Sequence, residues 1–142
     1  MDNSQKADST SSLRAQWILR IAVAGEFVGH GVFALQKRSD WVGWIKELTN
    51  VDTAVAAQLL FLVGITDMLV ALIILARPVP VVLLWAVFWG FWTALVRPLV
   101  GKDLWGKDVW DFVERWANWG APLALLVLMG FPKTLKDWFR FH

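Results

Sequence analysis

The stretch that decides the fold is AVAAQLLFLVGITDMLVALIILA, residues 54–76, in which Asp67 is the single charged side chain. Its length matches the roughly 20 residues that a helix needs to cross a hydrocarbon core about 30 Å thick. It ends at Arg77-Pro78-Val79-Pro80, where the prolines block continuation of a helix. We therefore predict a transmembrane helix over residues 54–76 that is followed by a tight turn.

Three further apolar stretches lie at about 15–35, 81–96 and 109–131. Within lipid, each spanning segment must bond its own backbone N–H and C=O groups, so such stretches form helices. We predict an all-α integral membrane protein, an antiparallel four-helix bundle over residues 13–142, with Pro122 kinking the last span. Residues 1–12, MDNSQKADSTSS, are polar and Ser-rich and are predicted to form a disordered tail.

The composition of the 142-residue chain also indicates a membrane protein. Hydrophobic residues make up 57% of it, charged residues only 18%, and the mean hydropathy is +0.50. The absence of Cys excludes disulfides, thiolate chemistry and cysteine-ligated metals, and His30 and His142 alone do not predict a metal site. A net charge of +2 is too small to indicate a nucleic-acid partner.

A short amphipathic segment separates the first two spans. Its apolar side chains Trp41, Trp44, Ile45 and Leu48 fall at positions i, i+3, i+4 and i+7, which places them on one face of a helix. We predict a short helix that lies in the headgroup region of the membrane. The same pattern equally fits a loop that folds over the mouth of the bundle and uses the same apolar stripe.

Polar side chains follow one helical face of the first span and one face of the fourth, at a depth that also includes the end of the third span. Ionisable groups are costly at bilayer depth, so several in one short chain are expected to face one another or a cavity. We predict one buried ligand-binding pocket lined by Glu26, His30, Arg97, Glu114, Arg115 and Asn118. The alternative is an ion-pair network that only fixes the register of the helices.

Glu26 and His30 are the candidate catalytic residues, although the sequence assigns no catalytic role beyond this. They lie one helical turn apart on the first span, where each would make the charged form of the other less costly. We predict a coupled pair that can relay protons.

Arg20 and Asp67 are expected at similar depth on the terminal side of the bundle, and we predict a structural ion pair between them. The GxxxG pattern of Gly25 and Gly29 is interpreted as helix packing within the molecule. An aromatic face on the third span either faces lipid or forms a stacking wall for a flat ring; it consists of Trp85, Phe88, Trp89 and Trp92.

The first two spans resemble the DoxX family of small bacterial four-helix membrane proteins. The resemblance rests on Arg20 followed by GEFVGHGVFAL, similar to the Arg-then-"hG" opening helix of that family, and on Gly64-Ile65-Thr66-Asp67, where the family usually has Gly-x-x-Glu. It implies a multi-pass protein of the bacterial inner membrane, associated with membrane redox subunits and with a quinone. Carried over by motif position, Arg20, Glu26, His30 and Asp67 are the matching residues.

Two classes of function therefore compete. In the first, the protein is an accessory or catalytic subunit of a quinone-linked membrane redox system, with no intrinsic cofactor of its own. In the second, it is a non-enzymatic membrane module that binds a lipid or hydrophobic small molecule, or scaffolds a larger complex. Lys and Arg are equally frequent on both predicted sides. Since the bases on the terminal side have fewer acidic neighbours, we expect cytoplasmic termini.

Overall fold

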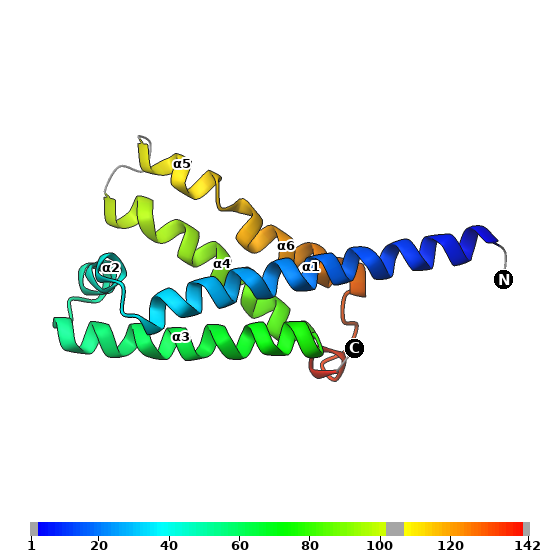
Figure 1. Ribbon diagram of the computed structural model, residues 1–142, viewed down its shortest axis with the longest axis horizontal. Coiled ribbons are helices and arrows are strands. Elements are labelled where there is room, and N and C mark those ends of the chain that lie inside the picture. The colour runs from blue at the N-terminus through cyan, green and yellow to red at the C-terminus, as the bar shows by residue number, and fades with distance from the viewer. Residues whose placement is uncertain (1–2, 102–106, 141–142) are drawn as a thin grey trace.

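The computed structural model describes residues 3–101 and 107–140 of the chain, and this part is all-α, as predicted (Figure 1). The helices in chain order are α1 (Asn3–Leu35), α2 (Ser39–Thr49), α3 (Thr53–Ala76), α4 (Pro80–Gly101), α5 (Lys107–Val113), α6 (Trp116–Met129) and the 3-10 helix η1 (Asp137–Phe139). Before η1, the N–H and hydroxyl of Thr134 both donate to the carboxylate of Asp137. The hydroxyl in particular holds the pKa of Asp137 below its ordinary value.

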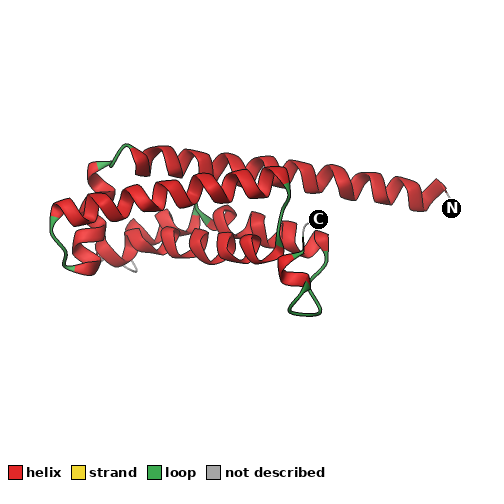
Figure 2. Ribbon diagram, turned by 90° about the horizontal axis from the view of Figure 1, so that it is seen from below, coloured by secondary structure: helices red, strands yellow, loops and turns green. Residues whose placement is uncertain are grey.

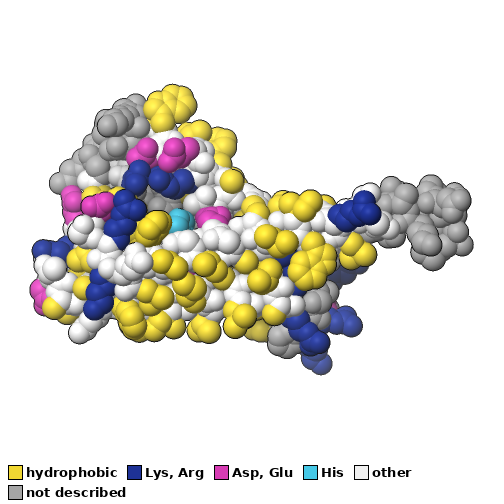
Figure 3. All heavy atoms as spheres, in the orientation of Figure 1, with side chains coloured by type: hydrophobic (Ala, Val, Ile, Leu, Met, Phe, Trp, Pro, Cys, Tyr) yellow, Lys and Arg dark blue, Asp and Glu magenta, His cyan; other side chains and the backbone are white. Residues whose placement is uncertain are grey.

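Three helical segments are long and apolar enough to cross a membrane, namely Thr10–Leu35, Thr53–Ala76 and Pro80–Val100. Their outer faces carry large apolar side chains that no other part of the described chain covers; on α3, Leu62, Leu69 and Leu72 are 58%, 54% and 63% exposed. Figure 3 shows apolar side chains along the middle of the molecule and charged ones gathered toward its ends. An apolar surface of this extent indicates a membrane protein.

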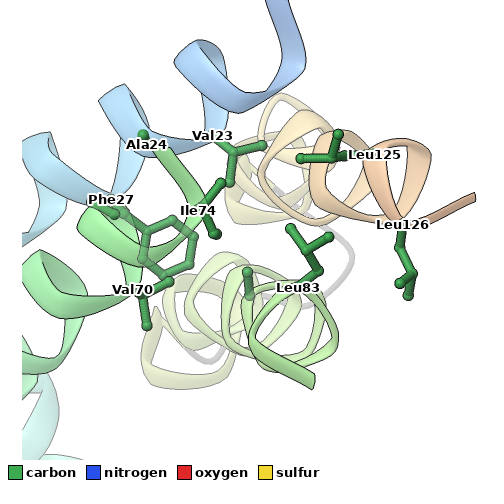
Figure 4. Packing of buried hydrophobic residues seen from close by; sticks show 10 residues of the cluster. Val23, Ala24, Phe27, Val70, Ile74, Leu83, Leu125 and Leu126 are labelled. Carbon is green, nitrogen blue, oxygen red and sulfur yellow. The ribbon is translucent and has the colours of Figure 1, made fainter. Parts of the chain in front are cut away.

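The helices pack as two pairs. α1 lies along α3 and α4 lies along α6, and contacts between α1 and α6 join the pairs, whereas α3 and α4 touch less (Figure 2). The largest core cluster joins α1, α3, α4 and α6 in the half of the molecule near the turn between α3 and α4 (Figure 4). Its members include Val23, Phe27, Val70, Ile74, Leu83, Leu125 and Leu126.

The close approach of α1 and α3 depends on a pair of glycines different from the predicted one. A Cβ added at Gly64 would lie 2.9 Å from the backbone N of Leu35 and 3.0 Å from the carbonyl O of Gly31. A Cβ added at Gly25 or Gly29 would meet nothing within 4 Å. The prediction that Gly25 and Gly29 mediate packing within the molecule was therefore wrong, because that face of α1 points away from the other helices.

The predicted fourth span is interrupted, but not at Pro122. α5 ends at Val113 and α6 begins at Trp116, while Pro122 is buried inside α6. In a continuous helix the backbone N–H of Arg115 would donate to the carbonyl of Asp111. At the break this N–H donates instead to the carbonyl of Phe112. The guanidinium of Arg115 donates to the Asp111 carbonyl in its place, at 2.8 Å. The arginine side chain thus stabilises the break.

The N-terminal segment also differs from the prediction of a disordered tail over residues 1–12. Residues 1 and 2 lie outside the described residues, and α1 begins at Asn3 and extends well past the other helices (Figure 1). Residues 3–24 contain neither Gly nor Pro. Once the apolar part of α1 is helical, each added residue gains a hydrogen bond, so the polar segment continues the helix.

Candidate functional site

A cavity of about 300 Å³ lies between the two helix pairs, in the half of the molecule that the main core cluster leaves open. It has side chains from α1, α2, α3 and α4 and from the junction of α5 and α6. Most of its wall is apolar and aromatic: Phe33, Trp41, Trp44, Ile45, Leu48, Leu60, Val63, Trp89, Trp92 and Val96. This is the size and composition of small-molecule sites in proteins.

α2 forms one wall of this cavity. The stripe predicted from helical spacing, Trp41, Trp44, Ile45 and Leu48, lines the cavity as a set. The rings of Trp41 and Trp44 stack with their centroids 6.3 Å apart and an interplanar angle of 22°. The segment is therefore a helix, as the first of the two predicted arrangements has it, but its apolar stripe lines the cavity, as the loop alternative has it.

The aromatic face of α4 is divided between the cavity and the outside. Trp89 and Trp92 line the cavity, and Trp92 is also 37% exposed, whereas Trp85 and Phe88 are outside the cavity lining and are 40% and 56% exposed. The rings of Trp85 and Trp89 stack at 5.5 Å and 11°. Trp89 and Trp92 therefore provide flat surfaces inside the cavity, while Trp85 and Phe88 remain available for contact with lipid.

Six polar side chains also line the cavity: His30, Arg38, Asp67, Thr93, Arg97 and Arg115. Each guanidinium has a carboxylate partner, with Arg97 Nη1 2.8 Å from Asp111 Oδ2, Arg115 Nη2 3.1 Å from Glu114 Oε1, and Arg38 Nη2 3.4 Å from Asp40 Oδ2. The Arg97–Asp111 pair connects α4 to α5 and thereby holds the broken segment against the bundle.

The structure brings together three of the six predicted pocket residues. His30, Arg97 and Arg115 line the cavity, whereas Glu26, Glu114 and Asn118 are not among its lining residues. The side chain of Glu114 is 61% exposed on the outside of the helix break. The carbonyl of Asn118 lies against Gly90 at the crossing of α4 and α6. Helical phase alone misplaced these two residues, because the break at Arg115 interrupts the phase of the segment.

The predicted pair of Glu26 and His30 is also arranged differently. Among the described side chains, His30 contacts the ring of Trp41 edge-on at 5.7 Å between centroids and shares no hydrogen bond or ion pair with Glu26. Glu26 lies one turn further along α1 toward the core cluster, within electrostatic range of Asp67. The His30 side chain therefore lines the cavity, and the Glu26 side chain does not.

The predicted ion pair of Arg20 with Asp67 is replaced by other contacts. The guanidinium of Arg20 donates to the carbonyls of Ile74, Leu75 and Ala76 at 3.1, 2.6 and 2.9 Å, and it lies 4.0 Å from the Trp17 ring centroid. These carbonyls end α3 and have no partners within that helix. Asp67 lies about 10 Å further along the helix axis, out of reach of Arg20.

Asp67 is the cavity residue that the sequence analysis assigned to another role. It is 2% exposed, and its Oδ1 has no hydrogen-bond partner among the described residues. The indole N–H of Trp89 interacts with the same carboxyl group. Its position as the single charge of residues 54–76 was the available signal, because a lone acid in an apolar span indicates a polar cavity.

Comparison of the chain with family models, with curated proteins and with solved structures found no match in any of the three. The DoxX resemblance of the first two spans therefore stays a prediction. In the described part of the chain, no group of three or more His, Cys, Asp or Glu side chains is arranged to hold a metal ion. The cavity and its polar side chains are the features on which a function can be argued.

Proposed function

We propose that this protein is a multi-pass membrane protein whose cavity binds the ring headgroup of a quinone-class, lipid-soluble molecule. The observation that carries the proposal is the combination of Trp41, Trp44, Trp89 and Trp92 with a small set of polar groups in one cavity of about 300 Å³. Aromatic walls favour a flat ring, and convergent polar groups orient its oxygen atoms.

The cavity residues divide into two roles in this proposal. Trp89 and Trp92 from α4 and Trp41 and Trp44 from α2 would contact the faces of the ring. The imidazole of His30 and the guanidinium of Arg97 would donate hydrogen bonds to ring oxygens. A bound quinone would supply two-electron redox chemistry. The chain contains no Cys, so it has no thiol that could carry out such chemistry itself.

The wider assignment rests on the resemblance and on the sequence. We propose a DoxX-like protein of the bacterial inner membrane that serves as an accessory subunit beside other membrane redox subunits. In this arrangement α1, α3 and α4 cross the membrane, and the α5–α6 segment provides a broken fourth crossing, which completes an antiparallel four-helix bundle with cytoplasmic termini. A break is tolerated at membrane depth where the surrounding protein satisfies the backbone, as the Arg115 side chain does here.

Mass spectrometry of lipids that co-purify with the protein tests this function. The wild-type protein is purified in detergent, extracted with organic solvent, and analysed for quinones relative to an empty-membrane preparation. We expect about one quinone per chain for wild type and for Trp110→Ala, whose indole is 69% exposed and outside the cavity. The Trp44→Ala protein should lose most of the bound quinone. Absence of quinone from the wild-type protein would overturn the proposal.

A second function is favoured by one specific observation. Arg97 and Arg115 are already paired with acidic side chains at 2.8 and 3.1 Å, which is the arrangement expected if these residues only fix helix packing. In that case the protein is a non-enzymatic module that holds a lipid or scaffolds a membrane complex. The same extraction separates the two, because a stoichiometric lipid other than a quinone, or an empty cavity, would favour this second function.

A further inference from the structure

The Asp67 carboxyl group is the least satisfied polar group in the cavity. It is almost fully buried, it lines the cavity, and its Oδ1 has no hydrogen-bond partner among the described residues. A buried oxygen without a partner is costly, and native proteins rarely leave one so. Asp67 lines the cavity but Oδ1 itself is covered, so a donor in the cavity reaches this acceptor only when a neighbouring side chain of the wall moves aside.

The backbone around Asp67 is held rigidly. Gly31 of α1 and Gly64 of α3 bring the two helices into close contact one turn before Asp67, and a Cβ at Gly31 would lie 3.4 Å from Asp67 Cβ. On the next turn Val70 and Ala71 belong to the core cluster. Asp67 cannot swing out to solvent without separating α1 from α3, so its carboxyl group stays at the cavity wall.

The charges in the cavity decide what kind of donor fits. Arg38, Arg97 and Arg115 line the same cavity as Asp67, and His30 adds a further nitrogen base. Each of these guanidinium groups already has a carboxylate partner, and a cationic ligand would lose its hydration in the apolar cavity. A neutral hydroxyl avoids this desolvation cost, donates one hydrogen bond, and can be carried by a flat ring between the tryptophans.

We propose that Asp67 is the specificity-determining residue of the cavity, which selects ring compounds with a free hydroxyl by accepting its hydrogen bond at Oδ1. This inference rests on the proposed function and narrows it to the hydroxyl-bearing class, quinols and phenols. The oxidised quinone has nearly the same outline but no hydroxyl donor, and the O-methylated ring keeps the aromatic ring but carries methyl groups in place of the donor hydrogens. Both leave Oδ1 unpaired.

Binding measurements with three related probes test the proposal. A decyl-tailed benzoquinol, the corresponding quinone and the di-O-methyl ether are titrated into the detergent-solubilised full chain by calorimetry under anaerobic conditions. We expect the quinol to bind wild type at least about tenfold more tightly than either other probe, the usual cost of leaving a buried acceptor unpaired. The ratio should fall to about one in Asp67→Ala. Asp67→Asn, which retains a carbonyl acceptor, should keep part of the preference.

A matched control is Asp52→Asn on the same helix. Asp52 is the exposed N-cap of α3, and Asn caps helices equally well, so this variant should keep the wild-type ratio. Equal binding of the three probes to wild type would overturn the role of Asp67 and leave the proposed function standing. Binding of none of them would overturn the proposed function itself. If Asp67→Ala does not fold, the wild-type protein and Asp67→Asn still decide the matter. A wild-type ratio near one contradicts the proposal, and so does a ratio in Asp67→Asn that is unchanged from wild type.

Discussion

Arg20 shows how a single basic side chain can be accommodated in an apolar helix. Its guanidinium reaches the last carbonyls of α3, where Pro78 prevents further helix and the oxygens would otherwise lack donors. The positive charge also lies at the C-terminal end of the helix dipole, which favours cations. Arg20 therefore links α1 to α3 through backbone groups rather than through Asp67.

Arg20→Ala should destabilise the protein. It removes three hydrogen bonds from a charged donor and leaves carbonyls at the end of α3 unpaired, at a cost of about 1.5–3 kcal/mol. Thermal unfolding in detergent measures the loss. Arg14→Ala, at an exposed position of the same helix, is the control and should change the midpoint little. Equal midpoints for the two variants would show that the Arg20 contacts contribute nothing.

At the scale of the elements, two glycine contacts determine how the helices cross. Gly64 admits the backbone of α1, and Gly90 admits the carbonyl of Asn118 on α6. That carbonyl is the one that the residue at position 122 would bond in an ordinary helix, and Pro122 has no N–H to do so. Proline and glycine on neighbouring helices thus form one packing unit.

Alanine substitutions should distinguish glycines at close helix–helix contacts from a glycine that faces open space. Gly64→Ala and Gly90→Ala place a Cβ within 3 Å of backbone atoms of another helix, so each should cost about 1–3 kcal/mol of stability. Gly29→Ala meets open space and should be neutral or stabilise by roughly 0.5–1 kcal/mol, because alanine favours the helix. Unfolding midpoints of the three variants in detergent provide the comparison. A Gly64→Ala protein as stable as Gly29→Ala would contradict the observed crossing.

At the scale of the whole molecule, the densely packed core cluster and the cavity lie in opposite halves of the bundle. The main core cluster joins four helices near the turn between α3 and α4. In the other half the pairs α1–α3 and α4–α6 are less closely joined, and α2 lines the space between them. A site between helix pairs, beside a densely packed core, gives a ligand room without loosening the whole bundle.

Cysteine labelling should establish how this molecule crosses the membrane. The natural chain has no Cys, so single substitutions can be labelled selectively. If α1, α3, α4 and the α5–α6 segment each cross once, Gln5→Cys and Lys136→Cys should react with an impermeant thiol reagent from the same side. Glu47→Cys on α2 should react from the opposite side. Labelling of positions 5 and 136 from opposite sides would exclude an even number of crossings.

Much of the fold followed from local properties of the sequence. The apolar lengths of residues 15–35, 54–76 and 81–96 correspond to three long helices, because the requirement to bond the backbone within each segment acts on the segment alone. The amphipathic stripe of Trp41, Trp44, Ile45 and Leu48 also identified α2 and its apolar face from spacing alone. His30 and Arg97 lie at the cavity for the same reason, since helical phase places side chains on one face of a continuous helix. Arg115 also lines the cavity, although it stands at the break between α5 and α6.

Only the tertiary structure decided which groups meet across the helices. The sequence did not show that Arg20 reaches the end of α3, that Arg115 interrupts the fourth span, or that Asp67 enters the cavity with one oxygen unpaired. These outcomes depend on the rotation and axial offset of whole helices. Packing contacts such as Gly31 against Gly64 set both, between residues far apart in the chain. Periodicity within one helix carries no information about that offset.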